Sequence, residues 1–185
     1  HSLTGLTVQE VEDRMHVHII ALTGSGDLEL TPVRDTVIPP QATLGLVAPT
    51  KYLDAFSDRL EVRLVRSKHY PGEFVRDSQA GCSEVVIHAE SQLVGLSISD
   101  IWLRRNYRLA GLGINRGNTI YNHEIRQLSM HAGDTLLTFS EHGAFADLRK
   151  NRDFIPISET KESETDKSKQ SPVALFFLGV SLGLV

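Results

Sequence analysis

Apolar and polar positions near the start of the chain follow two different periods, which predict a helix followed by a strand. Apolar residues recur at Val8, Val11 and Met15, the i, i+3, i+7 spacing of one face of an amphipathic helix. A β-branched, apolar strand is then predicted over residues 18–22. The helix leaves three acidic residues on its outer side: Glu10, Glu12 and Asp13.

The chain continues with a glycine turn and further β segments. Gly24 and Gly26 can both take positive φ, so residues 23–27 are predicted to form a hairpin turn. A phosphate cradle is the other interpretation of these glycines, but the helix and the third glycine of a dinucleotide fingerprint are missing. Strands are predicted over 43–48 and over 60–66, where apolar and charged residues alternate, with a short helix over 52–59 between them.

A second series of elements begins with an apolar strand over 84–88. Ser97 is a favourable N-cap, Asp100 completes a capping box, and Leu96 and Ile101 are placed as a hydrophobic staple. A helix is therefore predicted to start at Ser97. The pattern after it predicts strands over 108–114, 119–122 and 135–139, turns at 115–118 and 133–134, and a closing helix over 144–150.

The two series are related by an internal repeat. Sliding the sequence by ninety positions places Leu3-Thr4-Gly5-Leu6-Thr7 on Leu93-Val94-Gly95-Leu96-Ser97. The acidic residue of the capping box recurs as well, since Glu10 falls on Asp100. A repeat of this length predicts two homologous small domains rather than a solenoid, whose repeats are shorter.

The second repeat carries the run Leu93-Val94-Gly95-Leu96-Ser97-Ile98-Ser99-Asp100-Ile101 and, before its last strand, Gly133-Asp134. In these features it resembles the TrkA C-terminal domain, also called the RCK C-domain. The first repeat is similar in its helix and has Ala42-Thr43 where the second has Gly133-Asp134. The resemblance implies an α+β fold of two tandem small domains with β-α-β-β-β-α topology.

The first repeat lacks the opening strand that precedes the helix of the second. Either the sequence starts inside a longer protein, which we favour, or a strand comes from elsewhere. We assign residues 1–66 to the first domain, residues 67–83 to a polar connection and residues 84–157 to the second domain.

Two segments come after the second domain. Residues 158–171 mix acidic residues with lysines and contain no large apolar residue, so they are expected to form a charged linker. Residues 172–185 carry no charge, and this predicts the start of a transmembrane helix, which needs roughly 20 such residues to cross a bilayer. A core or partner-docking helix is the alternative.

Composition narrows the function classes. A formal net charge of −4 gives no basic footprint for nucleic acid. Cys82 is the single cysteine, which excludes an internal disulfide and fits a reducing compartment. The chain has eight histidines, but His16 and His18 are spaced i, i+2 and share no helix face. Neither a metal site nor a cofactor is expected.

Candidate site residues gather around the predicted helix and hairpin of the second domain. Their guanidinium, amide and imidazole groups suit an anionic ligand such as a nucleotide or a carboxylate, and a solvated polar face is the alternative. The residues are Arg104, Arg105, Asn115, Arg116 and His123.

No pattern predicts catalysis. Ser140, Glu141 and His142 are adjacent, but a fold assembles a catalytic triad from distant positions. The sequence has no nucleophile elbow, Walker loop or paired-carboxylate motif. The chain is therefore expected not to be an enzyme.

Two such domains, a charged linker and an apolar segment together resemble the cytoplasmic insert of permeases in the divalent anion:sodium symporter family. This resemblance implies a regulatory, ligand-binding and dimerisation module at the cytoplasmic face of the cell membrane. The parent transporter would be a sodium-coupled permease for sulfate or a dicarboxylate. The alternatives are a regulatory module of a potassium uptake system and a free-standing soluble ligand-binding protein.

Trp102 and Leu103 are the candidate partner surface. At the ninety-residue shift they fall on Glu12 and Asp13, so the fold is expected to accept charge there. Aromatic residues are enriched and acidic ones depleted in interface cores, which predicts a partner surface at this pair. The partner is either the other repeat or a second copy of the chain, and we favour a two-fold homodimer. Burial of Trp102 within its own domain is the alternative.

Overall fold

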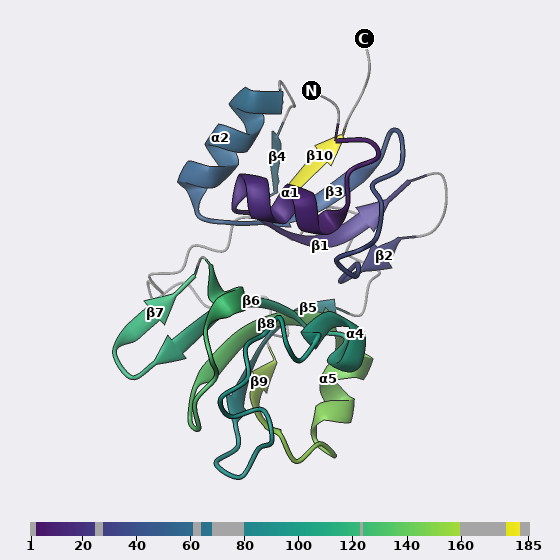
Figure 1. Cartoon of the computed structure of the whole chain (residues 1–185). Coiled ribbons are helices and arrows are strands. Elements are labelled where there is room, and N and C mark those ends of the chain that lie inside the picture. The colour runs from purple at the N-terminus through teal and green to yellow at the C-terminus, as the bar shows by residue number, and fades with distance from the viewer. Residues whose placement is uncertain are drawn as a thin grey trace.

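A computed structural model of the chain describes residues 3–24, 28–60, 64–67, 80–122, 124–159 and 177–181. Its first domain consists of α1 (Val8–Met15), β1 (His18–Thr23), β2 (Glu29–Leu30), β3 (Thr43–Val47), α2 (Thr50–Leu60), β4 (Leu64–Ser67) and β10 (Phe177–Ser181). The five strands form one antiparallel sheet in the order β2-β1-β3-β10-β4 (Figure 1).

Helices α1 and α2 cover one face of this sheet. The predicted capping box starts α1, because Thr7 Oγ1 accepts the Glu10 amide while the Thr7 amide donates to the Glu10 carboxylate. The apolar faces of both helices then close a core over the strands; it includes Val8, Val11, Leu53, Phe56, Ile19, Leu44 and Leu46.

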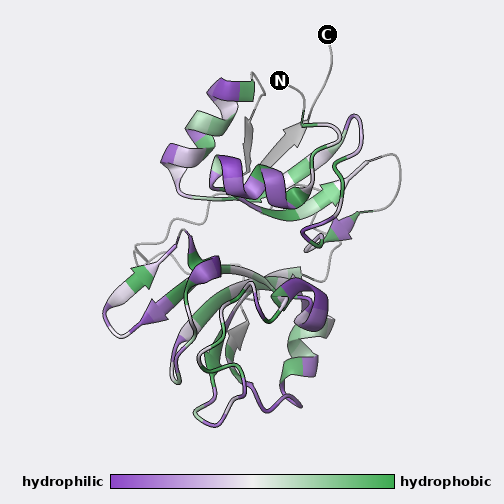
Figure 2. Cartoon of the chain, in the orientation of Figure 1, coloured by the Kyte–Doolittle hydropathy of each residue, from purple (hydrophilic) through white to green (hydrophobic). Residues whose placement is uncertain are grey.

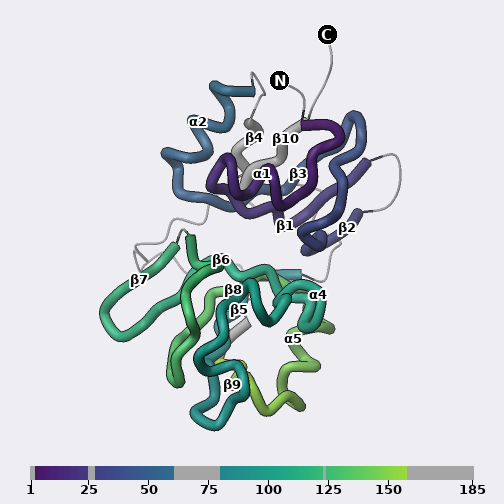
Figure 3. The backbone as a smooth tube through the Cα atoms, viewed as in Figure 1, coloured from purple at the N-terminus to yellow at the C-terminus, as the bar shows by residue number. Residues whose placement is uncertain are grey.

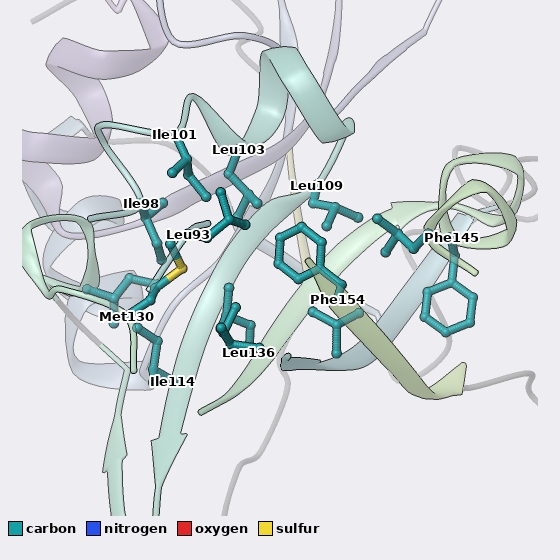
Figure 4. Close-up of a cluster of buried hydrophobic side chains, with 14 residues drawn as sticks. Leu93, Ile98, Ile101, Leu103, Leu109, Ile114, Met130, Leu136, Phe145 and Phe154 are labelled. Atoms are coloured by element: carbon teal, nitrogen blue, oxygen red, sulfur yellow. The ribbon is translucent and has the colours of Figure 1, made fainter. Parts of the chain in front are cut away.

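The second domain repeats this plan. It consists of β5 (Ala80–Ile87), α4 (Leu103–Tyr107), β6 (Ala110–Arg116), β7 (Thr119–Tyr121), the 3-10 helix η1 (Ile125–Gln127), β8 (Thr135–Glu141), α5 (His142–Leu148) and β9 (Phe154–Glu159). Its antiparallel sheet has the order β7-β6-β8-β5-β9. The core shown in Figure 4 packs Leu136 and Ile114 of the sheet against Leu103, Phe145 and Met130.

The two sheets correspond strand by strand, and the predicted α+β class is confirmed. In the second sheet, β5 lies between β8 and β9. The same place in the first sheet, between β3 and β4, is filled by β10. The first domain therefore has a strand at the position of its missing opening strand, supplied from the C-terminal part of the chain.

The C-terminal apolar segment differs from its predicted structure. A membrane helix was expected over 172–185, but Phe177–Ser181 form a strand that pairs on both sides. Among the described helices, none has both the length and the apolar composition needed to cross a membrane. The other residues of this segment, and residues 160–171 of the predicted linker, lie outside the described part of the chain.

Two predicted boundaries also move. Strand β5 begins at Ala80, inside the predicted connection, and β9 runs to Glu159, inside the predicted linker. The predicted helix start at Ser97 is wrong as well. The capping-box bonds of Ser97 and Asp100 are present, but they close a turn, and the helix α4 starts only at Leu103. Trp102 takes a left-handed conformation with φ 50°, which interrupts the helical path.

This interruption marks a two-residue insertion. Matching backbone bonds tie Gly5 to Ile38 and Gly95 to Met130, and a bulge at Ile20 in β1 matches one at Leu112 in β6. Before the insertion equivalent residues are ninety positions apart, and after it they are ninety-two apart. Both helices end in a left-handed residue, at His16 and at Arg108. Counting back from these ends, Glu12 corresponds to Arg104 rather than to Trp102, and the two additional residues lie at the interruption next to Trp102 and Leu103.

The two sheets stack through the faces that their helices leave free. Figure 3 traces the two bodies, and Figure 2 shows that β1, β3, β6 and β8 are largely hydrophobic whereas α1 and α4 are largely hydrophilic. β1 and β6, which are equivalent strands, contact each other in this stack. Its apolar centre consists of Ile20 and Val47 from the first domain and Ala80, Cys82, Ala110, Leu112 and Phe139 from the second.

Candidate functional site

A buried ion pair joins the domains next to the apolar stack. Glu12 Oε1 lies 2.5 Å from Arg104 Nη2, and the two side chains are only 5% and 9% exposed. Glu12 also accepts the Ile19 amide at 2.8 Å and Arg34 Nη1 at 2.7 Å. Both carboxylate oxygens of Glu12 therefore accept hydrogen bonds, which a carboxylate needs when burial removes it from water.

Arg104 reaches across from the second domain into the first. Besides Glu12 it donates from Nη1 to the Pro32 carbonyl oxygen at 2.9 Å. Because it bonds two separate segments of the first domain, this guanidinium fixes the orientation of one domain against the other. The prediction that Glu12 lies on the outer, exposed side of its helix is wrong, because the second domain covers this residue.

Further charges surround this pair in a complementary arrangement. Arg34 and Arg126, which are equivalent ninety-two positions apart, both bind Asp13, at 2.8 and 3.2 Å. Arg105 binds Asp35 at 2.9 Å in an exposed pair. Among the described residues, the first domain brings three carboxylates and one guanidinium to these ion pairs, and the second brings three guanidinium groups. The cluster therefore has one positive charge in excess.

A cavity of about 290 Å³ opens beside these charges, between the two domains. Among its lining residues are Arg34, Arg104, Arg105, Arg126, His18 and Trp102. Burial lowers the pKa of His18, so its imidazole is neutral at neutral pH. Burial also lowers the pKa of Arg34, and its Nε atom has no hydrogen-bond acceptor in the described part of the chain.

Trp102 stands at the cavity with 57% of its surface exposed. The Arg105 guanidinium lies 5.0 Å from the centre of its ring, within the range of a cation–π contact. Leu103, by contrast, is buried in the core of the second domain with 3% exposure. Of the predicted partner pair, only Trp102 is available at the surface.

The predicted anion-site residues do not form one group. Arg104 and Arg105 line the cavity between the domains. Arg116 instead donates from Nε and Nη2 to Asp134, at 2.8 and 2.7 Å, and from Nη2 to the Ser129 carbonyl oxygen. Asn115 is exposed on β6, and His123 lies outside the described residues. Asp134, in the predicted turn at 133–134, accepts the His131 amide and also binds Arg116.

Sequence reasoning missed Glu12, Asp13, Arg34 and Arg126. The missing signal was the ninety-two-residue spacing, which places Arg34 on Arg126 and Glu12 on Arg104. A ninety-residue shift does not include the insertion at Trp102–Leu103, so it misaligns the residues that come after it by two positions.

Cys82 lies in the apolar stack between the sheets, a few residues into β5. It is buried and free. Burial raises the pKa of its thiol to about 12. The thiol is therefore protonated and unreactive while the domains stay together.

Comparison with known proteins finds a distant relative of this chain. No family model matches the chain. An uncharacterized transporter of Synechocystis sp. (strain PCC 6803) is 21% identical over 193 aligned positions, which cover 99% of this chain. The chain spans 32% of the length of that protein. It is therefore similar to one part of a transporter.

Proposed function

We propose that this chain is a regulatory, non-catalytic module of a membrane transporter, placed at the cytoplasmic face of the membrane. The observation that carries the proposal is the alignment of nearly the whole chain with a third of a transporter. The sequence resemblance to TrkA C-terminal domains and to divalent anion:sodium symporters extends it. On that ground, the transported substrate is sulfate or a dicarboxylate, driven by sodium.

The arrangement of the domains supports a regulatory role. A ligand that enters the cavity touches both domains, so its binding energy depends on how they are oriented. A shift in that orientation is a signal that the rest of a transporter can receive. Membrane helices elsewhere in the protein would carry the substrate and the sodium ions.

The cavity favours a small anion. Its charges sum to one positive excess, and Arg34 Nε is a buried donor without an acceptor among the described residues. Guanidinium groups bind carboxylate and phosphate oxygens in paired hydrogen bonds. The flat exposed ring of Trp102 adds a stacking surface beside them, which suits a nucleotide as well as a dicarboxylate.

Calorimetric titration with sulfate, succinate and ATP tests the ligand. We expect at least one of these probes to release or absorb heat on binding to the wild-type chain and little heat with Arg126→Ala. Arg126 is the residue to replace because its partner Asp13 remains bound by Arg34. Arg116→Ala is the matched control, because Arg116 lies outside the cavity and should leave the heat unchanged. If Arg116→Ala alone removes the heat, the ligand lies at the hairpin; no heat with any probe would leave a purely structural role.

The transporter role is tested with the full-length protein that contains this chain. We expect apolar spans on both sides of it, and sodium-driven uptake of sulfate or succinate into reconstituted vesicles. Arg126→Ala should change how uptake responds to the bound probe without abolishing uptake. A dinucleotide-binding fold upstream would instead favour a potassium regulator, and neither feature would favour a free-standing ligand-binding protein.

A further inference from the structure

The first sheet is completed by a strand that is distant in the chain. β10 pairs with β3 from Phe177–Val47 to Ser181–Thr43, and with β4 from Phe177–Ser67 to Val180–Leu64. In the described part of the chain, β4 joins the sheet only through β10. The place between β3 and β4 is thus a slot, defined here as the strand slot, with hydrogen-bonding groups on both of its sides.

In the second domain the equivalent slot holds β5, which lies close in sequence to the rest of its domain. β5 ends at Ile87, and a short turn leads to Leu93. Leu93 and its equivalent Leu3 begin the same turn, in which their carbonyl oxygens accept the amides of Leu96 and Leu6 at 3.0 and 3.1 Å. Both leucines are buried, at 6% and 1% exposure. The chain can therefore run from a strand in the first slot into the turn at Leu3, just as it runs from β5 into the turn at Leu93.

An empty slot is costly for the first domain. β3 runs through the core, with Leu44 and Leu46 completely buried. Without a neighbour on that side, its backbone amides and carbonyls lose their hydrogen-bond partners, and β4 loses its connection to the sheet. The slot thus needs an occupant in every state in which the domain is folded.

We propose that the strand slot is a strand-accepting site that takes an extended segment running directly into Leu3 whenever Phe177–Ser181 lie elsewhere. The occupant is a strand of five to eight residues with apolar side chains at alternate positions, like β5. It binds by main-chain hydrogen bonds along both edges of the slot.

The test compares four proteins. They are the full chain, the chain ended after Glu159, that shortened chain with a copy of residues 80–92 fused ahead of Leu3, and the same fusion with Val86→Pro in the added copy. Proline cannot donate to the ladder of a central strand, so the last protein is a matched control. Amide exchange of residues 43–47 reports the slot, and residues 135–141 in the second domain serve as the internal reference.

We expect the shortened chain to exchange at residues 43–47 at least about tenfold faster than the full chain. The fused copy should restore protection, and the proline control should not. Protection that survives shortening would show that the slot needs no strand. Failure of the fused copy to restore it, with residues 135–141 still protected, would equally overturn the inference. This measurement involves no transport, so failure of the transporter proposal appears separately.

Discussion

Glu12 and Arg104 occupy equivalent positions in the two domains and form an ion pair with each other, with 2.5 Å between Oε1 and Nη2. Contact between equivalent residues is what occurs on the axis of a two-fold pair. In a true homodimer these residues would be identical, and like charges would meet in a buried place. The opposite charges therefore make each domain complementary to the other and unfavourable for its own copy.

Reversing one of these charges should open the interface. Arg104→Glu places two carboxylates together where the side chains are almost fully buried, and should lower the free energy of unfolding by about 3–5 kcal/mol. Urea unfolding followed by circular dichroism measures this change. The surface variant Arg14→Glu, whose pair with Glu10 is exposed, is the control and should leave stability nearly unchanged.

The double variant Glu12→Arg with Arg104→Glu should recover part of the lost stability, because the attraction between the domains returns. Recovery stays incomplete since the new arginine faces Arg34 and cannot accept the Ile19 amide. A double variant that is as unstable as the sum of the single changes would show that the pair is not coupled.

Cys82 should report the same opening through its reactivity. With a pKa of about 12 and a buried position, its thiol should react slowly with a disulfide reagent at pH 7 and rapidly in urea. Arg104→Glu should accelerate the reaction in native buffer. Rapid labelling of the wild-type chain would contradict the stacked arrangement of the sheets.

The raised pKa of Cys82 also predicts a pH dependence. Because the folded thiol holds its proton up to about pH 12 while an unfolded thiol releases it near pH 9, this group stabilises the fold fully below about pH 9. The contribution is lost as the pH rises toward 12. Cys82→Ala should show a shallower loss of stability over this range than the wild-type chain, and equal slopes would contradict the prediction.

The two capping boxes should contribute to acid sensitivity. The bond from the Thr7 amide lowers the pKa of Glu10, and the bond from the Ser97 hydroxyl lowers the pKa of Asp100. A lowered pKa gives stability above the unfolded value, near 4.5 for Glu10 and 3.8 for Asp100, and loses it as the pH falls through the folded value. Glu10→Gln should therefore unfold less steeply with acid, as thermal midpoints at a series of pH values would reveal.

Arg116 should matter for the stability of the second domain rather than for ligands. Burial raises the pKa of Asp134, but the bonds from Arg116 and the His131 amide outweigh it, so the net pKa is lowered. Arg116→Ala leaves this buried carboxylate with fewer donors and should cost about 1–3 kcal/mol by urea unfolding. Arg116→Lys should restore only part of this stability, because one ammonium group cannot reproduce the bidentate hydrogen bonding to Asp134.

We propose Trp102 as the contact of a homodimer, since it is a large exposed aromatic residue held in a left-handed turn. Light scattering should give the mass of a dimer for the wild-type chain and of a folded monomer for Trp102→Glu. Leu103 is not substituted in this test because it is buried, so a change there could unfold the domain and hide the effect on dimerisation. A monomeric wild-type chain would contradict the prediction.

The fold was largely predictable because local chemistry specifies it. The capping boxes at Thr7 and Ser97 and the turns at Gly117 and Gly133 are short-range signals, and the capping box occurs in both repeats. The prediction of a helix start at Ser97 was wrong because a capping box specifies only the first turn. The path of the chain beyond that turn depends on Trp102, whose left-handed conformation no local pattern indicates.

The site was less predictable because it lies between the domains. Glu12 on an amphipathic helix has the pattern of a solvent-facing residue, and its burial comes from Arg104, which lies 92 positions away. Arg104 and Arg105 were singled out for their charge, and they do line the cavity. Arg116 carries the same charge but is neutralised by Asp134, which sequence spacing alone does not indicate.

The insertion at Trp102–Leu103 has a meaning for how this protein could have evolved. In an assembly of two identical chains every mutation is made twice, so an extra pair of residues would appear on both sides of the axis at once. Here one gene segment encodes each half separately. One half could gain an aromatic residue at the mouth of the cavity while the other kept its uninterrupted helix α1. A symmetric ancestor thereby becomes a protein with two different halves.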